Sequence, residues 1–302
     1  MAVVSPLRYP GGKGRLSFFI QYIILKNNLY GGSYVEPYVG GGGIACDLLL
    51  SGVVSHIIIN DIDKAIWAFW DSIINAPDAL CKLIKDTPVS VDEWQRQKMI
   101  QNSLTATTLE LGFSTFFLNR TNVSGVLKGG IIGGLSQQGN YPITARFNKN
   151  ELIKRISAIA EKRTSITLHC LDAIDLLNTI KGTINAHSLI YFDPPYYVKG
   201  KGLYRNFYTD KDHANIASSI KKLRTPWICS YDNVPEIRKL YKRIQKYVYD
   251  INYSAKSHCF GKEVIFFSRN LTIPDIKSPL EIKACNVRKL KKSLDCTIEN
   301  IK

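Results

Sequence analysis

A five-residue turn in the second half of the chain combines residue types that could do chemistry. Asp193 to Tyr197 reads DPPYY and follows directly on the apolar run Ser188–Phe192. Because proline cannot extend a β-ladder, we expect a strand to end here and to present the acid at its carboxyl end. In open α/β sheets this is the edge where ligands bind. Alone, the same pattern is also typical of a strand-ending turn with no catalytic role.

The reaction that this turn could support is methylation of a planar amine. An amine attached to an aromatic ring is a poor nucleophile because its lone pair is delocalised into the ring. The Asp193 carboxylate and the Pro194 carbonyl could accept its two hydrogens and free the lone pair. Pro195 would stiffen the turn, and Tyr196 would stack on the substrate, as in pockets for flipped bases. The amine then attacks a sulfonium methyl in line, through positioning and electrostatics and without a metal.

A second set of residues predicts a cofactor site in the first half of the chain. A strand pattern, Ser33–Pro37, leads into the glycines at 40–43, a helix pattern and the buried strand His56–Asp61. Gly40 to Ala45 fits the G-x-G-x-x-A fingerprint, and Asp61 lies about 20 residues on, where an acid accepts hydrogen bonds from ribose hydroxyls. This order predicts a cofactor containing adenosine, either a nicotinamide dinucleotide or a methyl donor.

The amino-terminal segment Arg8–Gly14 (RYPGGKG) fits the same interpretation. Its paired glycines allow a tight bend, Lys13 offers a cation for a cofactor carboxylate, and Tyr9 offers an aromatic face. The alternative is a simple turn with a solvated lysine.

Alternating strand and helix patterns must position these motifs. They predict one discontinuous α/β domain, residues 1–74 and 151–272, that closes with an antiparallel pair of strands at 243–253 and 263–268. Residues 75–150 form an insertion of mainly helical pattern, with a Gly-rich stretch, Ser124–Phe147, that we expect to be a hairpin or an ordered surface loop. A basic tail, residues 273–302, follows; we expect a solvated helix face or an auxiliary phosphate contact.

Composition narrows the possible partners and compartments. The 302 residues carry a formal net charge of +15, which favours a polyanionic partner. The seven cysteines are scattered and odd in number, which argues against a disulfide framework or zinc site and for the reducing cytoplasm. We see no signal peptide and no apolar run of about 18 residues that would span a membrane.

Five motifs in order, RYPGGK, YVEPYVGGGG, NDID, LNRTNVSG and DPPYY, resemble the Dam-type (D12 class) DNA adenine-N6 methyltransferases. The resemblance runs from about Pro6 to about Arg269. It implies a Rossmann-like, S-adenosylmethionine-dependent methyltransferase fold with an inserted target-recognition domain. It also implies transfer of a methyl group to the N6 amine of an adenine flipped out of double-stranded DNA, by a monomer in the cytoplasm of a bacterial or phage-infected cell.

The resemblance also assigns site residues. The implied cofactor contacts are Tyr9, Lys13, Glu36, Pro37, Tyr38, Gly40, Gly42, Asp61, Ile62, Asp172 and Asp193. The implied catalytic residues are Asp193, Pro194, Pro195 and Tyr196, and no metal is implied. Two departures are small: Tyr9 stands where the family often has Trp, and Gly43 replaces a bulkier or hydroxyl residue.

The insertion departs most from the family. It lacks the R-Y-N…G-x-F-N-V-P-F-G pattern of the members that read GATC, so the resemblance does not imply that target. By position it should still contact DNA, through Arg120, Asn122, Lys128, Gln137 and Arg146. Arginine can read guanine edges and Asn or Gln can read adenine edges. A phosphate contact or a structural role is the alternative for each residue.

Other functions remain open on the sequence alone. RNA attracts the same basic charge as DNA, and planar protein amides are methylated at comparable turns. A dinucleotide-dependent oxidoreductase would explain the glycines and Asp61 but gives DPPYY no role. A DNA-binding protein with a decayed methyltransferase fold would not need an intact Asp193. The long insertion and the basic charge favour DNA methylation.

Overall fold

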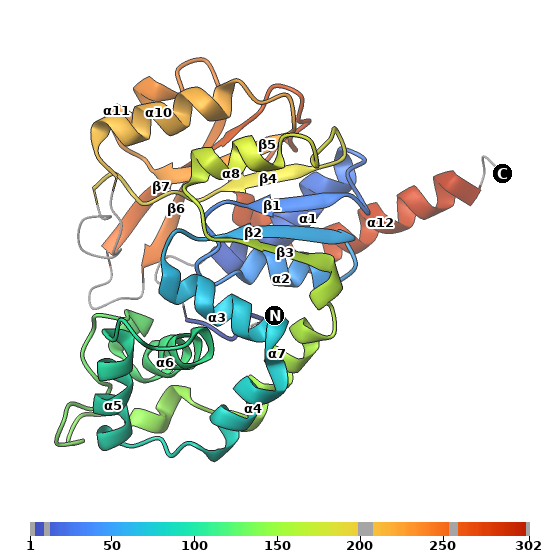
Figure 1. Ribbon diagram of the computed structural model, residues 1–302. Helices are drawn as coiled ribbons and strands as arrows, with labels where there is room; N and C mark the ends of the chain where they lie inside the picture. The colour runs from blue at the N-terminus through green and yellow to red at the C-terminus, as the bar shows by residue number, and fades with distance from the viewer. Residues whose placement is uncertain (1–3, 9–12, 199–207, 254–258, 300–302) are drawn as a thin grey trace.

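The computed structural model describes residues 4–8, 13–198, 208–253 and 259–299 and is built around a seven-stranded sheet with helices on both faces (Figure 1). The strand order is β3-β2-β1-β4-β5-β7-β6. The strands are β1 (Ser33–Glu36), β2 (His56–Asn60), β3 (Ile166–His169), β4 (Leu189–Phe192), β5 (Trp227–Asp232), β6 (Gln245–Tyr253) and β7 (Cys259–Phe267). The first five are parallel, and β7 runs antiparallel between β5 and β6. The expected closing antiparallel pair is therefore confirmed.

The strands are short apolar runs because both faces of the sheet are covered. On β1, Tyr34 packs into one hydrophobic cluster and Val35 into the other, as the alternation of side chains along a strand requires. All four residues of β4 are buried, which is typical of parallel strands between two helix layers. One face is covered by α1 (Ser17–Lys26), α2 (Gly43–Leu50), α3 (Lys64–Asn75) and α7 (Lys149–Ala160), and the other by α8 (Ala173–Ile180), α10 (Asp210–Lys221) and α11 (Pro235–Leu240).

The segment between the two halves is mainly helical, as expected. It contains α4 (Pro77–Asp86), α5 (Val91–Gln101) and α6 (Thr108–Thr121), which lie together beneath the sheet in Figure 1. Its apolar side chains belong to the same hydrophobic cluster as α3 and α7. Phe116 of α6 stacks on Phe69 of α3 with ring centroids 5.9 Å apart and meets Phe147 at 5.4 Å. The segment thus has no core separate from that of the sheet.

The Gly-rich stretch forms an ordered loop, and the hairpin alternative is wrong. Among the described residues it makes a single isolated β-bridge, between Asn122 and Ile131, which is followed by turns and the short helix η3 (Ile143–Arg146). Side chains hold the loop: the Gln137 amide donates to the Ile132 carbonyl at 2.8 Å and accepts from the Ile143 amide at 2.8 Å. Gly133 and Gly134 have positive φ, which glycine adopts without strain, so the backbone can turn at this point of the loop.

The carboxyl-terminal tail forms a helix, α12 (Ala284–Glu299), that packs on α1 through Val287 and extends away from the body (Figure 1). Its basic residues Arg288, Lys289, Lys291 and Lys292 are exposed, as the solvated-face interpretation expects. Within the described ranges, no helix has both the length and the apolar composition needed to cross a membrane.

Candidate active site

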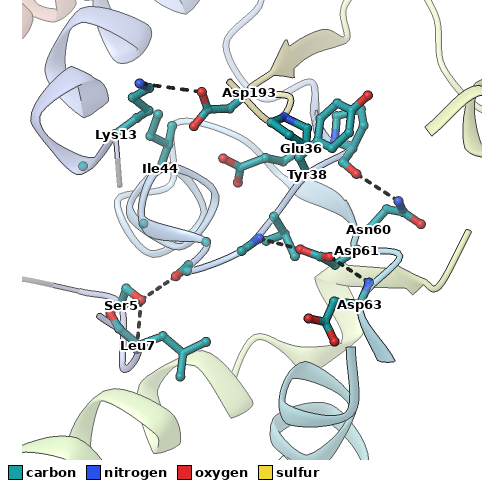
Figure 2. A pocket seen from close by; sticks show the side chains of 18 of the residues that line it. Ser5, Leu7, Lys13, Glu36, Tyr38, Ile44, Asn60, Asp61, Asp63 and Asp193 are labelled. Carbon is teal, nitrogen blue, oxygen red and sulfur yellow. Dashed lines mark hydrogen bonds and ion pairs between the residues drawn. The ribbon is translucent and has the colours of Figure 1, made fainter. Parts of the chain in front are cut away.

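A cavity of about 460 Å³ opens at the carboxyl ends of the parallel strands, where the order reverses between β1 and β4 (Figure 2). This switch point is where open α/β sheets bind their ligands. Most of the residues that the sequence singled out border this one cavity: Lys13, Glu36, Pro37, Tyr38, Gly40, Gly42, Asp61, Ile62, Asp172, Asp193 and Pro195. Tyr9 lies outside the described residues.

The glycine loop between β1 and α2 is held open by backbone and side-chain contacts. Gly40 and Gly42 have φ of 43° and 58°, values that glycine adopts without strain. The Gly40 amide donates to Asp61 Oδ2 at 3.0 Å, and Trp70 Nε1 donates to the Gly40 carbonyl at 3.0 Å. The Ser5 hydroxyl donates to the Gly41 carbonyl. The loop is therefore preformed around the cavity.

Two polar residues at the end of β2 connect the loops that surround the cavity. Asn60, which sequence reasoning missed, donates to the carbonyls of Pro37 and Leu171 at 2.9 and 3.0 Å. Asp61 accepts from the amides of Gly40 and Asp63 at 3.0 Å each. Burial raises the pKa of Asp61 to about 7, although these two hydrogen bonds act in the opposite direction. Its carboxylate has further lone pairs facing the cavity.

Two further acids lie on the cavity wall. Glu36 ends β1 and is buried, and among the described residues its Oε2 has no hydrogen-bond partner. Burial, and secondly the charge of Asp193, raise the pKa of Glu36 well above its usual value. Asp172 caps α8 by accepting from the Ile174 amide at 2.8 Å. The Ala45 amide also donates to the Glu36 carboxylate, but a buried carboxylate oxygen without a partner, such as Oε2, is costly unless a ligand supplies a donor.

The predicted acceptor, Asp193, stands at the end of β4 beside the cofactor loop. Its Oδ1 accepts from the Ser230 hydroxyl at 2.9 Å and lies 3.7 Å from the Lys13 ammonium. Its side chain keeps 21% of its surface exposed, so a substrate can reach it. Burial raises its pKa to about 6, against the lowering effect of Lys13. Pro194 behind it is buried, and Pro195 lines the cavity.

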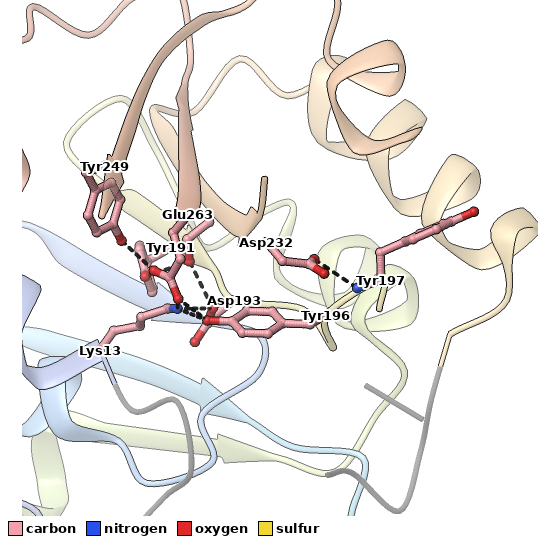
Figure 3. Close-up of polar contacts among 9 residues, drawn as sticks. Lys13, Tyr191, Asp193, Tyr196, Tyr197, Asp232, Tyr249 and Glu263 are labelled. Carbon is pink, nitrogen blue, oxygen red and sulfur yellow. Dashed lines mark hydrogen bonds and ion pairs between the residues drawn. The ribbon is translucent and has the colours of Figure 1, made fainter. Parts of the chain in front are cut away.

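The structure corrects the expected roles of Tyr196 and Lys13 (Figure 3). Tyr196 is 3% exposed and does not line the cavity as an open stacking platform. Its hydroxyl donates to the Glu263 carboxylate, and its ring lies 4.7 Å from the Lys13 ammonium. Lys13 borders the cavity, but its ammonium lies 2.7 Å from Glu263 Oε1, so it is paired within the protein and is not a free cation for a cofactor.

Sequence reasoning missed Glu263, although β7 carried a signal. A glutamate at the head of the apolar run EVIFF has no place in a buried strand unless it is paired. Asp232 at the end of β5 was missed as well: its carboxylate accepts from the amides of Tyr197 and Val198 at 3.0 Å each and fixes the exit of the DPPYY turn.

An aromatic cluster borders the same site. Tyr38 and Tyr208 share a hydrogen bond of 2.8 Å, and both line the cavity. Burial raises the pKa of Tyr208 to about 12. His213 lies buried in the first turn of α10, with Nδ1 3.2 Å from the Tyr231 hydroxyl. These contacts fix the start of α10 beside the DPPYY turn.

The expected DNA contacts divide into two groups. Asn122 is fully buried and accepts from Trp94 Nε1 at 2.6 Å, and the Arg120 guanidinium is buried and donates to the Pro6 carbonyl. The expectation that these two read bases is therefore corrected: they hold α6 and its loop to the rest of the protein. Gln137 braces its own loop. Lys128 and Arg146 are exposed and remain available to DNA.

Arg120 and Asn122 lie inside the protein because the carboxyl-terminal half of α6 is buried. Every residue of α6 from Gly112 to Thr121 is buried, the polar ones included. A polar residue on it therefore needs an internal partner. Burial, and then the charges of Arg155 and Arg8, lower the pKa of Arg120 to about 9.

Three features together define a Rossmann-like methyltransferase. They are the order of the strands in the sheet, the glycine loop at its switch point, and the DPPYY turn beside the same cavity. The chain matches the family model described as D12 class N6 adenine-specific DNA methyltransferase over residues 9–255, and it belongs to this family. It is also 24% identical over 244 residues to the Type II methyltransferase M.MjaIII of Methanocaldococcus jannaschii, covering 74% of this chain and 81% of that protein. Membership of this family makes the protein an adenine-specific DNA methyltransferase. It is therefore not the RNA methyltransferase, protein-amide methyltransferase or oxidoreductase that the sequence alone left open.

Proposed function

We propose that S-adenosylmethionine binds in the cavity and that Asp193 receives the N6 amine of an adenine flipped out of double-stranded DNA. One observation supports this most directly. The glycine loop with Asp61 and the DPPYY turn with Asp193 border a single cavity at the switch point of the sheet. A cofactor held by the loop and a base held at the turn would therefore meet inside it.

The acids on the cavity wall fit this cofactor. Asp61 would accept from the ribose hydroxyls, and Asp172, which also lines the cavity, would contact the cofactor's adenine. The unpartnered Oε2 of Glu36 suits the ammonium of the cofactor's amino-acid part. When bound, the cofactor supplies a methyl group on a sulfonium. Tyr9, Pro37, Tyr38, Gly40, Gly42 and Ile62 complete the proposed set.

The chemistry required of the chain is to bind and activate the amine. An ionised Asp193 and the Pro194 carbonyl accept the amine hydrogens, so that the nitrogen lone pair becomes available. Because burial raises the pKa of Asp193 to about 6, this carboxylate is a stronger proton acceptor than an exposed one. It can therefore take the proton that the amine loses once it is methylated.

The insertion is the proposed target-recognition region. Its exposed cations Lys128 and Arg146 would meet DNA, and the net charge of +15 would attract the phosphates. We propose that the enzyme acts as a cytoplasmic monomer on one short target sequence. The Type II designation of its relative supports a role beside a restriction enzyme.

The decisive experiment follows labelled methyl groups from S-adenosylmethionine onto unmodified double-stranded DNA, RNA and protein. We expect label on the adenines of DNA alone. Asp193→Ala should lower the rate about a thousandfold, because it removes a charged acceptor from the transition state. The variant should still bind the cofactor, as measured by calorimetry.

Glu236→Ala serves as the matched control, because this acid is exposed and is not among the residues that line the cavity. It should methylate DNA at the wild-type rate. Normal methylation by Asp193→Ala, or label found only on RNA or protein, would contradict the proposal.

A further inference from the structure

Glu263 is a buried acid that joins three residues of the site from outside the segment that the family model matches, residues 9–255. Its side chain is 0% exposed. Oε1 lies 2.7 Å from the Lys13 ammonium and accepts from the Tyr196 hydroxyl, and Oε2 accepts from the Tyr249 hydroxyl at 2.6 Å (Figure 3). Burial would raise its pKa, but Lys13 and the two tyrosines outweigh burial and lower it, so Glu263 is ionised at neutral pH.

A purely structural ion pair would be the simpler explanation of these contacts. Buried pairs contribute little net stability, because desolvation offsets most of the attraction. What sets this pair apart is its position. The Lys13 ammonium stands between two carboxylates, 2.7 Å from Glu263 and 3.7 Å from Asp193. The shorter contact is with the residue that has no access to the cavity.

We propose that Glu263 is a positioning residue for methyl transfer: it holds the Lys13 ammonium away from Asp193, so that the Asp193 carboxylate stays open to the substrate amine. The inference rests on the proposed role of Asp193. With Glu263 neutral, Lys13 would close onto Asp193 in a direct ion pair. That ion pair would occupy the lone pairs of the Asp193 carboxylate to which the substrate amine must donate. It would also lower the basicity of the carboxylate.

The charges around Asp193 determine the direction in which each substitution should shift its pKa. Lys13, Glu263 and Glu36 are charged or ionisable groups that interact with it electrostatically. So do the phenol of Tyr34 on β1, that of Tyr191 on β4 itself, and the phenol of Tyr231 and thiol of Cys229 on β5. After burial, Lys13 lowers the pKa of Asp193 and Glu263 raises it. Removing Glu263 should therefore lower that pKa, and removing Lys13 should raise it.

The test is the pH dependence of kcat/KM for DNA methylation, which reports ionisations of the free enzyme. In wild type we expect activity to rise with pH through about 6, as Asp193 ionises. Glu263→Gln should lower the plateau roughly tenfold to a hundredfold and move this limb to lower pH. Lys13→Met should move the limb to higher pH. Tyr249→Phe removes a neutral hydrogen bond from the same carboxylate and should leave the limb in place.

Opposite shifts in the two charge variants would support the proposal, since loss of packing alone cannot produce them. An unshifted limb in a folded Glu263→Gln enzyme would overturn it, whether or not the plateau falls. If that variant does not fold, Glu263→Asp keeps the charge and should retain the wild-type limb; a shifted limb there would also overturn the proposal. Normal activity in Asp193→Ala would instead reject the proposed function itself.

Discussion

Asp193, the proposed acceptor of the substrate amine, opposes the stability of its own fold when it is ionised. It stands at a strand end that the prolines enforce, close to Glu36 and Glu263, and mostly out of water. Ionisation there is unfavourable, and Lys13 and Ser230 relieve it only in part. A carboxylate under this constraint gains stabilisation when a substrate amine donates to it. The proposed acceptor is thus a residue whose charged form the folded protein disfavours.

We expect Asp193→Asn to increase the stability of the protein by an amount that depends on pH. The folded pKa of about 6 lies above the usual 3.8, so the unfolded chain loses its proton first as pH rises. The wild-type protein therefore loses stability between about pH 4 and pH 7, whereas asparagine does not titrate. At pH 7.5 the variant should be more stable by up to about 3 kcal/mol, while methyl transfer is lost.

The measurement is chemical denaturation of both proteins from pH 4 to pH 8. The two free energies of unfolding should converge near pH 4. A difference that stays constant with pH would mean that the pKa of Asp193 is not raised.

At the scale of elements, the turn between β1 and α2 shows why the glycines differ in importance. A Cβ at Gly42 would lie 2.5 Å from the ring of Trp70, and its φ of +58 strains any other residue. At Gly43 the nearest atom to such a Cβ is 3.8 Å away, an ordinary contact. Trp70 is buried and donates to the Gly40 carbonyl, so it cannot move without disturbing the loop.

We therefore expect Gly42→Ala to weaken cofactor binding at least tenfold and to destabilise the protein by about 1–3 kcal/mol, through backbone strain and overpacking. Gly43→Ala, the adjacent control, should bind cofactor as wild type does. Titration calorimetry with S-adenosylmethionine and thermal unfolding together check both variants. Equal affinities for the two variants would contradict the assigned role of the loop.

At the scale of the whole molecule, the insertion and the sheet share one hydrophobic core. Helix α6 packs so closely on α3 that a Cβ at Gly112 would lie 2.5 Å from the Ala68 carbonyl oxygen. Phe113, Phe116 and Phe117 of α6 complete the contact. We expect such an arrangement to unfold as one cooperative unit, although the insertion is the proposed target-recognition region.

Gly112→Ala should consequently lower the melting temperature of the entire protein. Overpacking of about 2 kcal/mol corresponds to several degrees in a protein of this size. In calorimetry we expect one transition at a lower temperature, and Gly182→Ala, where a Cβ meets no atom within 4 Å, should melt as wild type does. Two transitions, of which only one moves, would show that the insertion folds independently.

The sequence by itself predicted the seven strands, most of the helices and the edge of the sheet at which the cavity lies. It could do so because these features are local: glycines and prolines restrict the backbone where they stand, and apolar periodicity sets which face is buried. Asp193, Asp61 and Gly40, which the sequence singled out, all border one cavity, while their roles stay predictions. The Gly-rich loop was left between two alternatives because its conformation depends on the side chain of Gln137.

Only the tertiary structure decided which charges meet. Lys13 and Glu263 lie 250 residues apart in the chain, and no local pattern links them. Arg120 and Asn122 have the residue types of DNA contacts, yet the packing of α6 places them inside. Pairing energies depend on distance and burial, which are set only when the strands and helices assemble. The sequence therefore predicts which side chains can donate, accept or carry charge. It does not predict with which other side chain each of them forms a hydrogen bond or an ion pair.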